Sequence, residues 1–280
     1  MTRLAVLGSP IAHSQSPALH AAAYRALGLD WEYTAVDVTG DALPGFVRSR
    51  DDSWRGLSLT MPLKRDVLPL LDSVDDTARL TGGANTLLFD RTDGRTTLRG
   101  FNTDVYGVTR AFRDRGIARL DTAIVLGGGA TAASVVAAVA GLGAHTVTVA
   151  VRDPARATAL VMLGASLGLS VTLHPLDEAH TLPVADAVVS TIPGHGAHGV
   201  VFPAAVRSGS VLFDVAYDPW PSAFAASWLE AGGRVISGLE MLLHQAVAQV
   251  RVFVGGDPTA PLPDEAGVLA AMRASVAVGG

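Results

Sequence analysis

The chain has 280 residues, 49% of them hydrophobic and 17% charged, with a formal net charge of −5. This length and apolar content suffice to bury a core in one large domain or two smaller ones. The negative charge argues against nonspecific nucleic-acid binding, which requires a basic face, and the absence of cysteine excludes disulfides, thiolate metal sites and a cysteine nucleophile.

No apolar stretch reaches the length of a membrane span, because Gly, Thr or Arg interrupts each one. Met1 leads almost directly into strand-like residues, with no basic-then-apolar leader before them. We therefore expect a soluble cytoplasmic protein that binds neither nucleic acid nor membranes. The oligomeric state is left open, with a homodimer as one option.

Short apolar runs alternate with helix-like segments over most of the chain, which is typical of a parallel α/β fold. A helix is expected at 17–27, with Pro17 at its first position and Ser16 placed to cap it. The polar segment 90–99 is interpreted as the loop of a hairpin. Strands are expected at 4–8, 31–38 and 56–60.

A second module is expected to begin after a helix at 105–115. Its strands are predicted at 121–126, 146–151, 185–190 and 211–215, with a small-residue helix at 130–142 and an amphipathic helix at 239–253 that returns to the first module. The sequence thus predicts an α/β protein of two domains. Residues 1–104, completed by 239–280, would form an amino-terminal α/β substrate domain, and 105–238 a Rossmann-type dinucleotide-binding domain.

A glycine motif opens the helix at 130–142. Gly127-x-Gly129-x-x-Ala132 follows a strand, so it suits the Rossmann arrangement of a tight turn, a close backbone approach to pyrophosphate and a helix amino terminus facing its charge. A plain strand-to-helix turn is the alternative. The strand expected after the helix favours dinucleotide binding.

The end of the strand at 146–151 bears on the choice of cofactor. An Asp or Glu at this place suits the ribose hydroxyls of NAD, whereas Arg suits the 2′-phosphate of NADP. Here Val151 takes the place of the acid, and Arg152 and Arg156 favour NADP. Asp153 complicates this interpretation, because it could pair with either Arg or approach the ribose. Two exposed loop arginines without a ligand are the alternative.

The turn after the first strand is rich in polar residues. Ser14 and Ser16 can direct their hydroxyls to the same side of extended chain, beside a helix amino terminus that favours an anion such as a carboxylate. The alternative is that Ser16 only caps the helix.

These segments, taken in order from about residue 5 to residue 250, resemble the shikimate dehydrogenase family. The resemblance covers most of the chain. Each motif alone is only modestly specific for the family, but the motifs together in this order are very specific. The motifs are GSPIAHSQSP at 8–17, GLSLTMPLK at 56–64, GANT at 83–86, GFNTDVYG at 100–107, the glycine loop, STIP at 190–193, DVAY at 214–217 and GLEMLLHQA at 238–246.

The resemblance implies roles for matching residues. Lys64 and Asp104 would form the catalytic pair. Ser14 and Ser16 would hold the carboxylate of the substrate. The other oxygens of the substrate would be contacted, or the substrate pocket closed, by Thr60, Asn85, Tyr217 and Gln245. The cofactor would be bound by Gly127, Gly128, Gly129, Ala130, Arg152, Arg156, Thr191 and Val215, with Gly238 and Met241 near the nicotinamide.

Some positions depart from the family's pattern. Ser58 stands where the family usually has Asn, which puts one substrate contact in doubt. Val151 and Asp153 replace the usual Asn and Thr that flank Arg152, which weakens the NADP prediction without reversing it.

Lys64 is the only lysine among the 21 basic residues. Reduction of a ketone needs a hydride donor and a proton source, and a lysine can exchange a proton where an arginine stays protonated. Chance retention of one lysine is the alternative to a catalytic role. Asp104 would order the ammonium and hydrogen-bond the reacting hydroxyl, or it would cap the following helix. Which of the two moves the proton is left open.

Two further patterns bear on the site. Met241 and Gln245 are four residues apart and share a helix face, where a Gln among apolar residues needs a polar partner, either a substrate hydroxyl or a backbone group. His13, His20 and His244 have no metal-ligand spacing, so no metal is predicted.

The resemblance implies an oxidoreductase that interconverts 3-dehydroshikimate and shikimate with NADP, in aromatic amino acid (chorismate) biosynthesis. An NAD-dependent quinate/shikimate dehydrogenase is the nearest alternative, although Ser16, less bulky than Thr, favours shikimate. A non-catalytic nucleotide-binding sensor on the same fold is the alternative from another class. The presence of both Lys64 and Asp104 argues against the sensor.

Overall fold

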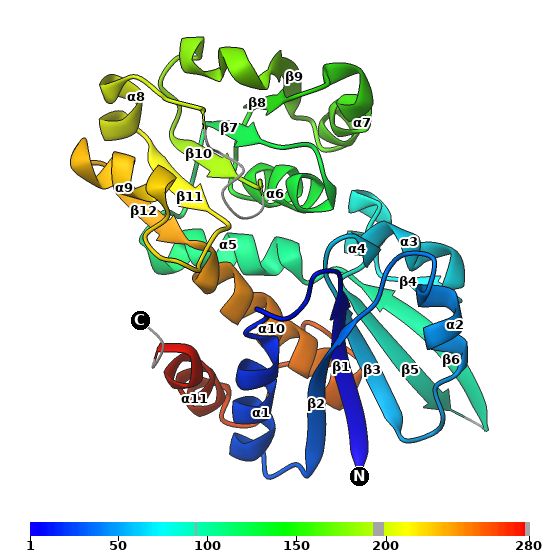
Figure 1. Cartoon of the computed structure of the whole chain (residues 1–280). Helices are drawn as coiled ribbons and strands as arrows, with labels where there is room; N and C mark the ends of the chain where they lie inside the picture. Colours follow the sequence, from blue (N-terminus) through cyan, green and yellow to red (C-terminus); the bar gives the residue numbers. More distant parts are fainter. Residues whose placement is uncertain (93, 193–198, 278–280) are drawn as a thin grey trace. The chain divides into compact units, whose positions relative to one another are not determined.

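A computed structural model describes residues 1–92, 94–192 and 199–277 of the chain (Figure 1). The chain divides into two compact units, Met1–Thr103 with Leu243–Gly280, and Asp104–Leu242. Each unit contains one six-stranded sheet with helices around it, so the α/β fold class is confirmed. Within the described ranges, no helix combines the length and the apolar character needed to cross a membrane.

The sheet of the first unit is mixed, in the order β2-β1-β3-β5-β6-β4. Strand β1 pairs in parallel with both β2 and β3, whereas β5 runs antiparallel to β3 and to β6. All three predicted strands of this part are present. The strands are β1 (Thr2–Gly8), β2 (Trp31–Asp37), β3 (Trp54–Leu59), β4 (Ser73–Val74), β5 (Thr86–Thr92) and β6 (Arg95–Phe101).

The helices of the first unit come from both ends of the chain. The carboxy-terminal helix α11 packs against α1, near the amino terminus. The apolar faces of the sheet and helices bury Leu57, Leu63 and Leu87 completely. The helices are α1 (Ser16–Ala26), α2 (Leu43–Arg48), α3 (Leu63–Asp66), η1 (Leu68–Leu70), α4 (Asp76–Thr81), α10 (Gly238–Gly255, here from Leu243) and α11 (Glu265–Ala277).

The predicted cap of α1 is wrong. The helix begins at Ser16 itself, and the position before it, Gln15, already has helical backbone angles and makes no side-chain cap. A capping residue must leave the helical conformation so that its side chain can reach the first free N–H groups. Instead, the Ser14 hydroxyl oxygen accepts the N–H of Ser16 at 3.3 Å.

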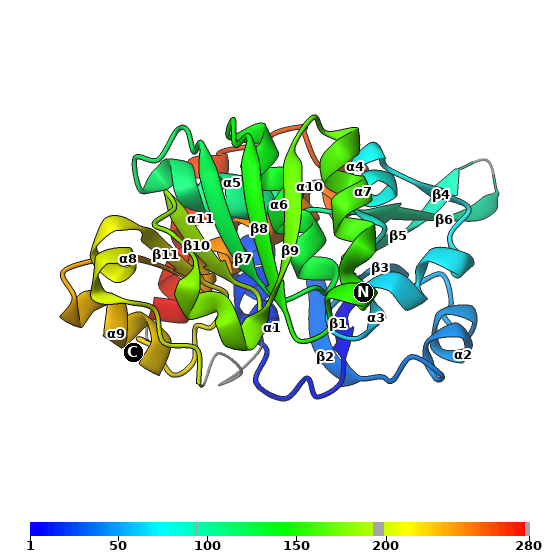
Figure 2. The ribbon, with the colours of Figure 1, turned by 90° about the horizontal axis from the view of Figure 1, so that it is seen from above.

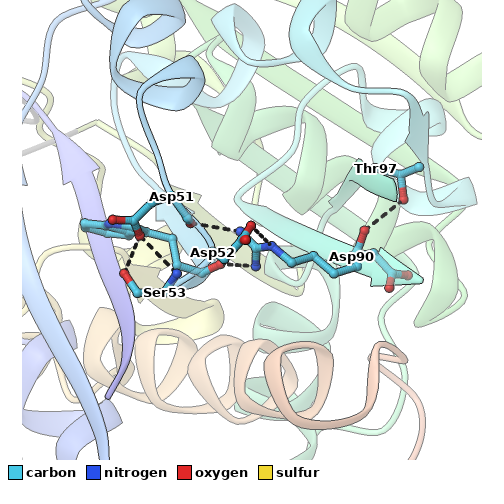
Figure 3. Close-up of polar contacts among 7 residues, drawn as sticks. Asp51, Asp52, Ser53, Asp90 and Thr97 are labelled. Atoms are coloured by element: carbon cyan, nitrogen blue, oxygen red, sulfur yellow. Dashed lines mark hydrogen bonds and ion pairs between the residues drawn. The ribbon is translucent and has the colours of Figure 1, made fainter. Parts of the chain in front are cut away.

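The predicted hairpin loop at 90–99 is also wrong. Strands β5 and β6 continue through most of this segment, with Asp90 opposite Thr97. The Thr97 hydroxyl donates to the Asp90 carbonyl (Figure 3), and Arg99 forms a 2.8 Å ion pair with the Asp90 carboxylate. Cross-strand polar pairs support an antiparallel ladder, so the polarity of this segment reflects exposure and does not break the strands.

The loop before β3 is tied to this hairpin. Ser53 donates its N–H and hydroxyl to Asp51 (Figure 3). Arg91 of β5 then donates to the Asp52 carboxylate at 3.1 Å and to the Asp51 carbonyl at 2.9 Å. These contacts lie at the edge where β3 begins, and they fix the loop without involving any predicted site residue.

The sheet of the second unit is entirely parallel, in the order β12-β11-β10-β7-β8-β9. Figure 2 shows β7, β8 and β9 side by side. Both faces of a parallel sheet are usually covered, and apolar residues are buried here in two separate clusters. The strands are β7 (Thr122–Leu126), β8 (Thr146–Val151), β9 (Ser170–Pro175), β10 (Ala187–Ser190), β11 (Val211–Asp214) and β12 (Arg234–Ser237).

The helices of the second unit connect these strands. One cluster combines strand residues with apolar residues of α5, α6 and α7, and the other with residues of α8 and α9. The helices are α5 (Asp104–Asp114), α6 (Ala130–Gly141), η2 (Pro154–Ala157), α7 (Thr158–Ser166), η3 (Leu176–Thr181), α8 (Ala204–Gly209), α9 (Ala223–Glu230) and the first residues of α10.

Candidate active site

The glycine loop of the second unit begins where β7 ends. Gly127 has a φ of +106°, which L side chains rarely adopt, and a Cβ atom there would lie 2.5 Å from the Thr191 hydroxyl oxygen. At Gly128 a Cβ would lie 3.1 Å from a methyl group of Val151. Gly127 is therefore required by the fold itself, whereas a side chain at Gly128 would need only a small shift of Val151.

Gly129 differs from the other two glycines. It occupies the N-cap position of α6, and a Cβ there would meet nothing within 4 Å. No side chain caps this end of α6, and Ala130 is the first residue of the helix. The amino terminus of a helix that lacks a side-chain cap can accept a phosphate through its N–H groups.

The glycine loop lies at the switch point of the parallel sheet. Strands β8 and β9 follow β7 on one side, whereas the later strands β10, β11 and β12 extend from its other side. Open α/β sheets bind ligands outside the carboxyl ends of their strands at such a point. Thr191, directly after β10, lies next to the loop, because its hydroxyl donates to the Leu126 carbonyl at 2.8 Å. Pro193 of the STIP motif lies outside the described residues.

Arg152 and Arg156 lie just beyond the carboxyl end of β8, and both are exposed. Asp153 between them accepts the N–H of Ala155 at 3.1 Å and so caps η2. Among the described residues, Asp153 forms an ion pair with neither arginine. Both guanidinium groups are therefore available to an anionic ligand at this edge.

Val215 and Gly238 meet at the carboxyl ends of β11 and β12. Val215 is half-buried, and its N–H donates to the Ser190 carbonyl at 3.0 Å. A Cβ at Gly238 would overlap the Val215 carbonyl oxygen, so only glycine fits this close backbone approach. Met241, one turn later, is 8% exposed and packs into a core cluster of this unit.

Asp214 organises the loop after β11 that carries Tyr217. Its carboxylate accepts the N–H of Ala216 at 3.2 Å and the hydroxyl of Ser222 at 2.6 Å, and Ser222 in turn caps α9. Burial raises the pKa of Asp214, and these hydrogen bonds partly oppose the shift. Tyr217 is half-buried in this loop.

Asp104 is the first residue of α5 and is 2% exposed. It therefore does not occupy the position before the helix from which a capping side chain acts. A carboxylate in the first turn still interacts favourably with the helix dipole. Asp104 belongs to the second unit, and Lys64 belongs to the first.

The predicted substrate residues of the first unit gather at one edge of its mixed sheet. The N–H of Leu59, the last residue of β3, donates to the Asn85 carbonyl at 2.8 Å, and the Asn85 N–H donates to the Phe101 carbonyl at 3.0 Å. Because β5 runs antiparallel to β3, the residue before β5 lies beside the end of β3. The ends of β1 and β3 and the beginning of β5 therefore meet at this edge.

Thr60 and Lys64 follow β3 at this edge. The N–H of Thr60 donates to the Leu7 carbonyl at 2.9 Å, which ties it to the end of β1. The Lys64 carbonyl accepts the N–H of Ala84 at 2.8 Å, so α3 is held against the GANT segment. Both side chains are half-buried. Lys64 thus lies on short helix α3, whose backbone is anchored next to Asn85.

Ser14 and Ser16 lie at the amino end of α1. Ser14 is half-buried and Ser16 is 5% exposed. Gln15, the residue before the helix, makes no side-chain cap, although the Ser14 hydroxyl oxygen accepts the Ser16 N–H. As at α6, such a helix end favours an anion.

Asn85 and Gln245 are brought together although 160 positions separate them. The Asn85 amide nitrogen donates to the Gln245 side-chain oxygen at 3.2 Å. The Asn85 side-chain oxygen accepts from the Thr103 N–H at 2.9 Å. Both amides are almost completely buried. Gln245 therefore has a polar partner, the Asn85 side chain, which was neither of the two partners expected. A contact with a substrate hydroxyl stays a prediction.

Two residues of this region were not singled out as functional from the sequence. Gln249 lies one turn after Gln245, and its side-chain nitrogen donates to the Asn85 carbonyl at 2.9 Å. Ser58 is 3% exposed and donates to Gln249 at 2.9 Å. The spacing of four between the two glutamines on one helix was the signal that could have revealed Gln249. The part of the chain that the structure describes contains no group of three or more His, Cys, Asp or Glu residues able to hold a metal ion.

Comparison with known proteins identifies shikimate dehydrogenases as relatives of this chain. A family model described as the shikimate dehydrogenase substrate binding domain matches residues 6–87. A shikimate dehydrogenase (NADP(+)) of Thermus thermophilus is 37% identical, covering 99% of this chain and 100% of the relative. Another, of Methanothermobacter thermautotrophicus, is 32% identical over 93% of this chain and 94% of the relative.

Solved structures agree. The shikimate dehydrogenase of Mycobacterium tuberculosis superposes with a TM-score of 0.84 at 42% identity, covering 98% of this chain and 100% of that one. A shikimate 5-dehydrogenase of Thermus thermophilus, solved in complex with NADP(H) and shikimate, has a TM-score of 0.80 at 34% identity and covers 99% and 100% of the two chains. The resemblance read from the sequence is confirmed: this chain belongs to the shikimate dehydrogenase family.

Proposed function

We propose that this protein is an oxidoreductase that interconverts 3-dehydroshikimate and shikimate with NADP(H). The observation that carries the proposal is the match, over nearly the whole chain, to relatives named shikimate dehydrogenase (NADP(+)) at 32% to 37% identity. The solved relative in complex with NADP(H) and shikimate supports both ligands. The reaction serves the biosynthesis of aromatic amino acids.

Residues 1–104 with 239–280 would form the substrate domain, and 105–238 the cofactor domain. Support comes from the family model of the substrate-binding domain, which matches residues 6–87, and from the parallel sheet with its glycine loop. Ser14 and Ser16 would hold the carboxylate at the amino end of α1. Thr60, Asn85, Tyr217 and Gln245 would contact the other oxygens of the substrate or close its pocket.

NADP supplies a hydride acceptor in one direction and, when reduced, a hydride donor in the other. The backbone of 127–130 would hold the pyrophosphate at the amino end of α6. Arg152 and Arg156, exposed and without an ion pair to Asp153 in the described structure, would bind the 2′-phosphate. Thr191, Val215 and Gly238 would line the carboxyl edge of the sheet, and Met241 would support the nicotinamide from the core.

Lys64 and Asp104 would manage the proton at the reacting oxygen. The Lys64 ammonium can give a proton to the developing alkoxide during reduction and take it back during oxidation. Asp104 would order that ammonium and the substrate hydroxyl. The general acid could be Lys64 alone or the pair.

Initial rates of absorbance change by the nicotinamide test the proposal. Purified protein is assayed with shikimate and with quinate, each with NADP+ and with NAD+, beside Lys64→Ala and Lys64→Arg. Fastest turnover is expected for shikimate with NADP+, with a loss of at least about 100-fold in both variants, because a guanidinium does not exchange the proton. Faster turnover with NAD+ or with quinate would refute the stated substrate and cofactor. Cofactor binding without turnover would refute the enzyme.

A further inference from the structure

Helix α10 carries a second buried amide beside the site. Gln249 is 2% exposed, four residues after Gln245, and therefore on the same face of the helix. Its side-chain nitrogen donates to the Asn85 carbonyl at 2.9 Å and to the Thr86 hydroxyl at 3.1 Å. One side chain of α10 is thus bonded both to the backbone and to a side chain at the beginning of β5.

The orientation of the Gln249 amide follows from its partners. A backbone carbonyl can only accept, so the Gln249 atom that faces the Asn85 carbonyl is the nitrogen. The Gln249 oxygen then accepts from the Ser58 hydroxyl at 2.9 Å and from the His20 Nε2–H at 3.2 Å. Both hydrogens of the amide and two acceptor positions on its oxygen are used.

The orientation of the Asn85 side-chain amide follows from its partners by the same argument. The backbone N–H of Thr103 can only donate, so the atom that faces it at 2.9 Å is the Asn85 oxygen. The Thr86 hydroxyl accepts from Gln249, and so it uses its own hydrogen to donate to the same oxygen at 2.8 Å. The Asn85 nitrogen is left facing the Gln245 oxygen at 3.2 Å.

These contacts form one directed chain from Gln249 through Thr86 to Asn85 and on to Gln245. We infer that Gln249 is a positioning residue, which fastens α10 to β5 so that Gln245 and Asn85 meet with the nitrogen of Asn85 facing the oxygen of Gln245. This inference rests on the proposed function only in that Asn85 and Gln245 contact the substrate. Gln249 itself would touch neither substrate nor cofactor.

The alternative is a buried glutamine that only stabilises the fold. Loss of Gln249 would then lower the unfolding midpoint and leave the Asn85 amide and the substrate KM unchanged. A positioning role requires a change at Asn85 as well. The test therefore needs a direct view of that amide.

The sequence offers such a view, because the chain contains only two asparagines, Asn85 and Asn102. Selective 15N labelling of asparagine side chains gives two amide signals, which Asn102→Asp would assign. The Asn102 nitrogen bonds to the Thr81 hydroxyl at 2.8 Å and to the Gly83 carbonyl at 3.0 Å, neither of which contacts Gln249. Asn102 is therefore an internal control in the same spectrum.

The test variant is Gln249→Met, which keeps an unbranched side chain of similar length but no amide. We expect the Asn85 side-chain signals to shift or broaden while those of Asn102 stay in place. The KM for shikimate should rise about tenfold, the effect of roughly one lost hydrogen bond. The KM for NADP+ should change less than about twofold, since no Gln249 contact leads to the glycine loop.

Tyr33→Phe is the matched control. It removes a buried 2.7 Å hydrogen bond to Ser58 but leaves the donation of Ser58 to Gln249 in place. This variant should lose stability and keep both the Asn85 signals and the shikimate KM. If Gln249→Met fails to fold, Thr86→Val removes only the hydroxyl that joins Gln249 to Asn85, and it should shift the Asn85 signals in the same way.

Two results would overturn the inference: Asn85 signals in the folded variant that coincide with those of the wild type, or a shikimate KM that rises no more than in Tyr33→Phe. An inactive wild type would instead refute the proposed function. The spectra would still decide whether Gln249 orients Asn85, because they require no turnover.

Discussion

His20 makes the stability of this protein dependent on pH in a way that can be calculated. Its side chain is completely buried, stacked on Tyr33 with 4.0 Å between ring centroids and packed near Tyr24 and Phe253. Its hydrogen-bond partners, Tyr24 and Gln249, carry no charge. Burial lowers the pKa of His20 to about 3, and the hydrogen bond to Gln249 opposes this only in part.

The sign of the effect follows from proton linkage. In the unfolded chain the pKa of a histidine is about 6.5, so below that pH the unfolded state binds a proton that the native state does not. The native state therefore loses stability as the pH falls from 6.5 towards 3. At pH 5 the loss due to His20 is about 2 kcal/mol, which corresponds to roughly 5 °C in the unfolding midpoint for a protein of this size.

Thermal unfolding followed by circular dichroism from pH 7.5 to 5 measures this loss, with His20→Gln as the comparison. A glutamine does not titrate and can still donate to Gln249. Subtraction of the two curves removes the contributions of all other groups, including Asp75 and Asp214, whose pKa burial raises. The wild type should lose its advantage over the variant as the pH falls. A difference that stays constant down to pH 5 would refute the assignment of a neutral, uncompensated His20.

The remaining predictions concern the second unit. Gly127→Ala should lower the unfolding midpoint by roughly 5 °C, because of the positive φ and the short contact with the Thr191 hydroxyl. Gly129→Ala should leave the midpoint unchanged and weaken NADP+ binding in calorimetry. Equal stability of the two variants would contradict this prediction. Arg152→Ala with Arg156→Ala should raise the KM for NADP+ about 10- to 100-fold and that for NAD+ little, and equal changes in initial-rate assays would count against a 2′-phosphate site. Since its pKa is raised, Asp214 makes stability fall as pH rises above its unfolded value of 3.8; chemical unfolding of Asp214→Asn should show a weaker fall, and an unchanged slope would disprove it.

Much of the fold of the second unit was readable from the sequence because its signals are local. The four strands predicted there, β7, β8, β10 and β11, are short apolar runs, and the glycine loop marks the turn between β7 and α6, whereas β9 and β12 are less apolar and were not predicted. Local sequence signals gave the wrong secondary structure where the residues of a strand are exposed and polar. The polar residues of β5 and β6 read as a loop, although pairs such as Asp90 with Arg99 hold two strands together. Helix α11 was missed altogether.

The candidate site was predictable to the extent that its residues lie in short motifs. Position within a motif marked Lys64 and Asn85, but it did not reveal their neighbours. The contact between Asn85 and Gln245 joins positions 160 apart, and that between His20 and Gln249 joins positions 229 apart. Such pairs depend on the order of strands in the sheet, which no local pattern specifies. Only its spacing of four from Gln245 pointed to Gln249, and its partners His20 and Asn85 lie too far away in the sequence for that spacing to identify them.

The two sheets differ in how far a general rule can locate their functional edge. In the second unit every strand is parallel, so all carboxyl ends lie together, and the rule for open α/β sheets predicts the cofactor site at that edge. In the first unit β5 is reversed, and the residue that precedes it lies beside the end of β3. Asn85 can therefore join Thr60 at one edge only because one strand runs against the others. That reversal could not be predicted from the sequence, and it also places the Asn85 carbonyl at the beginning of β5, where the Gln249 side-chain nitrogen donates to it.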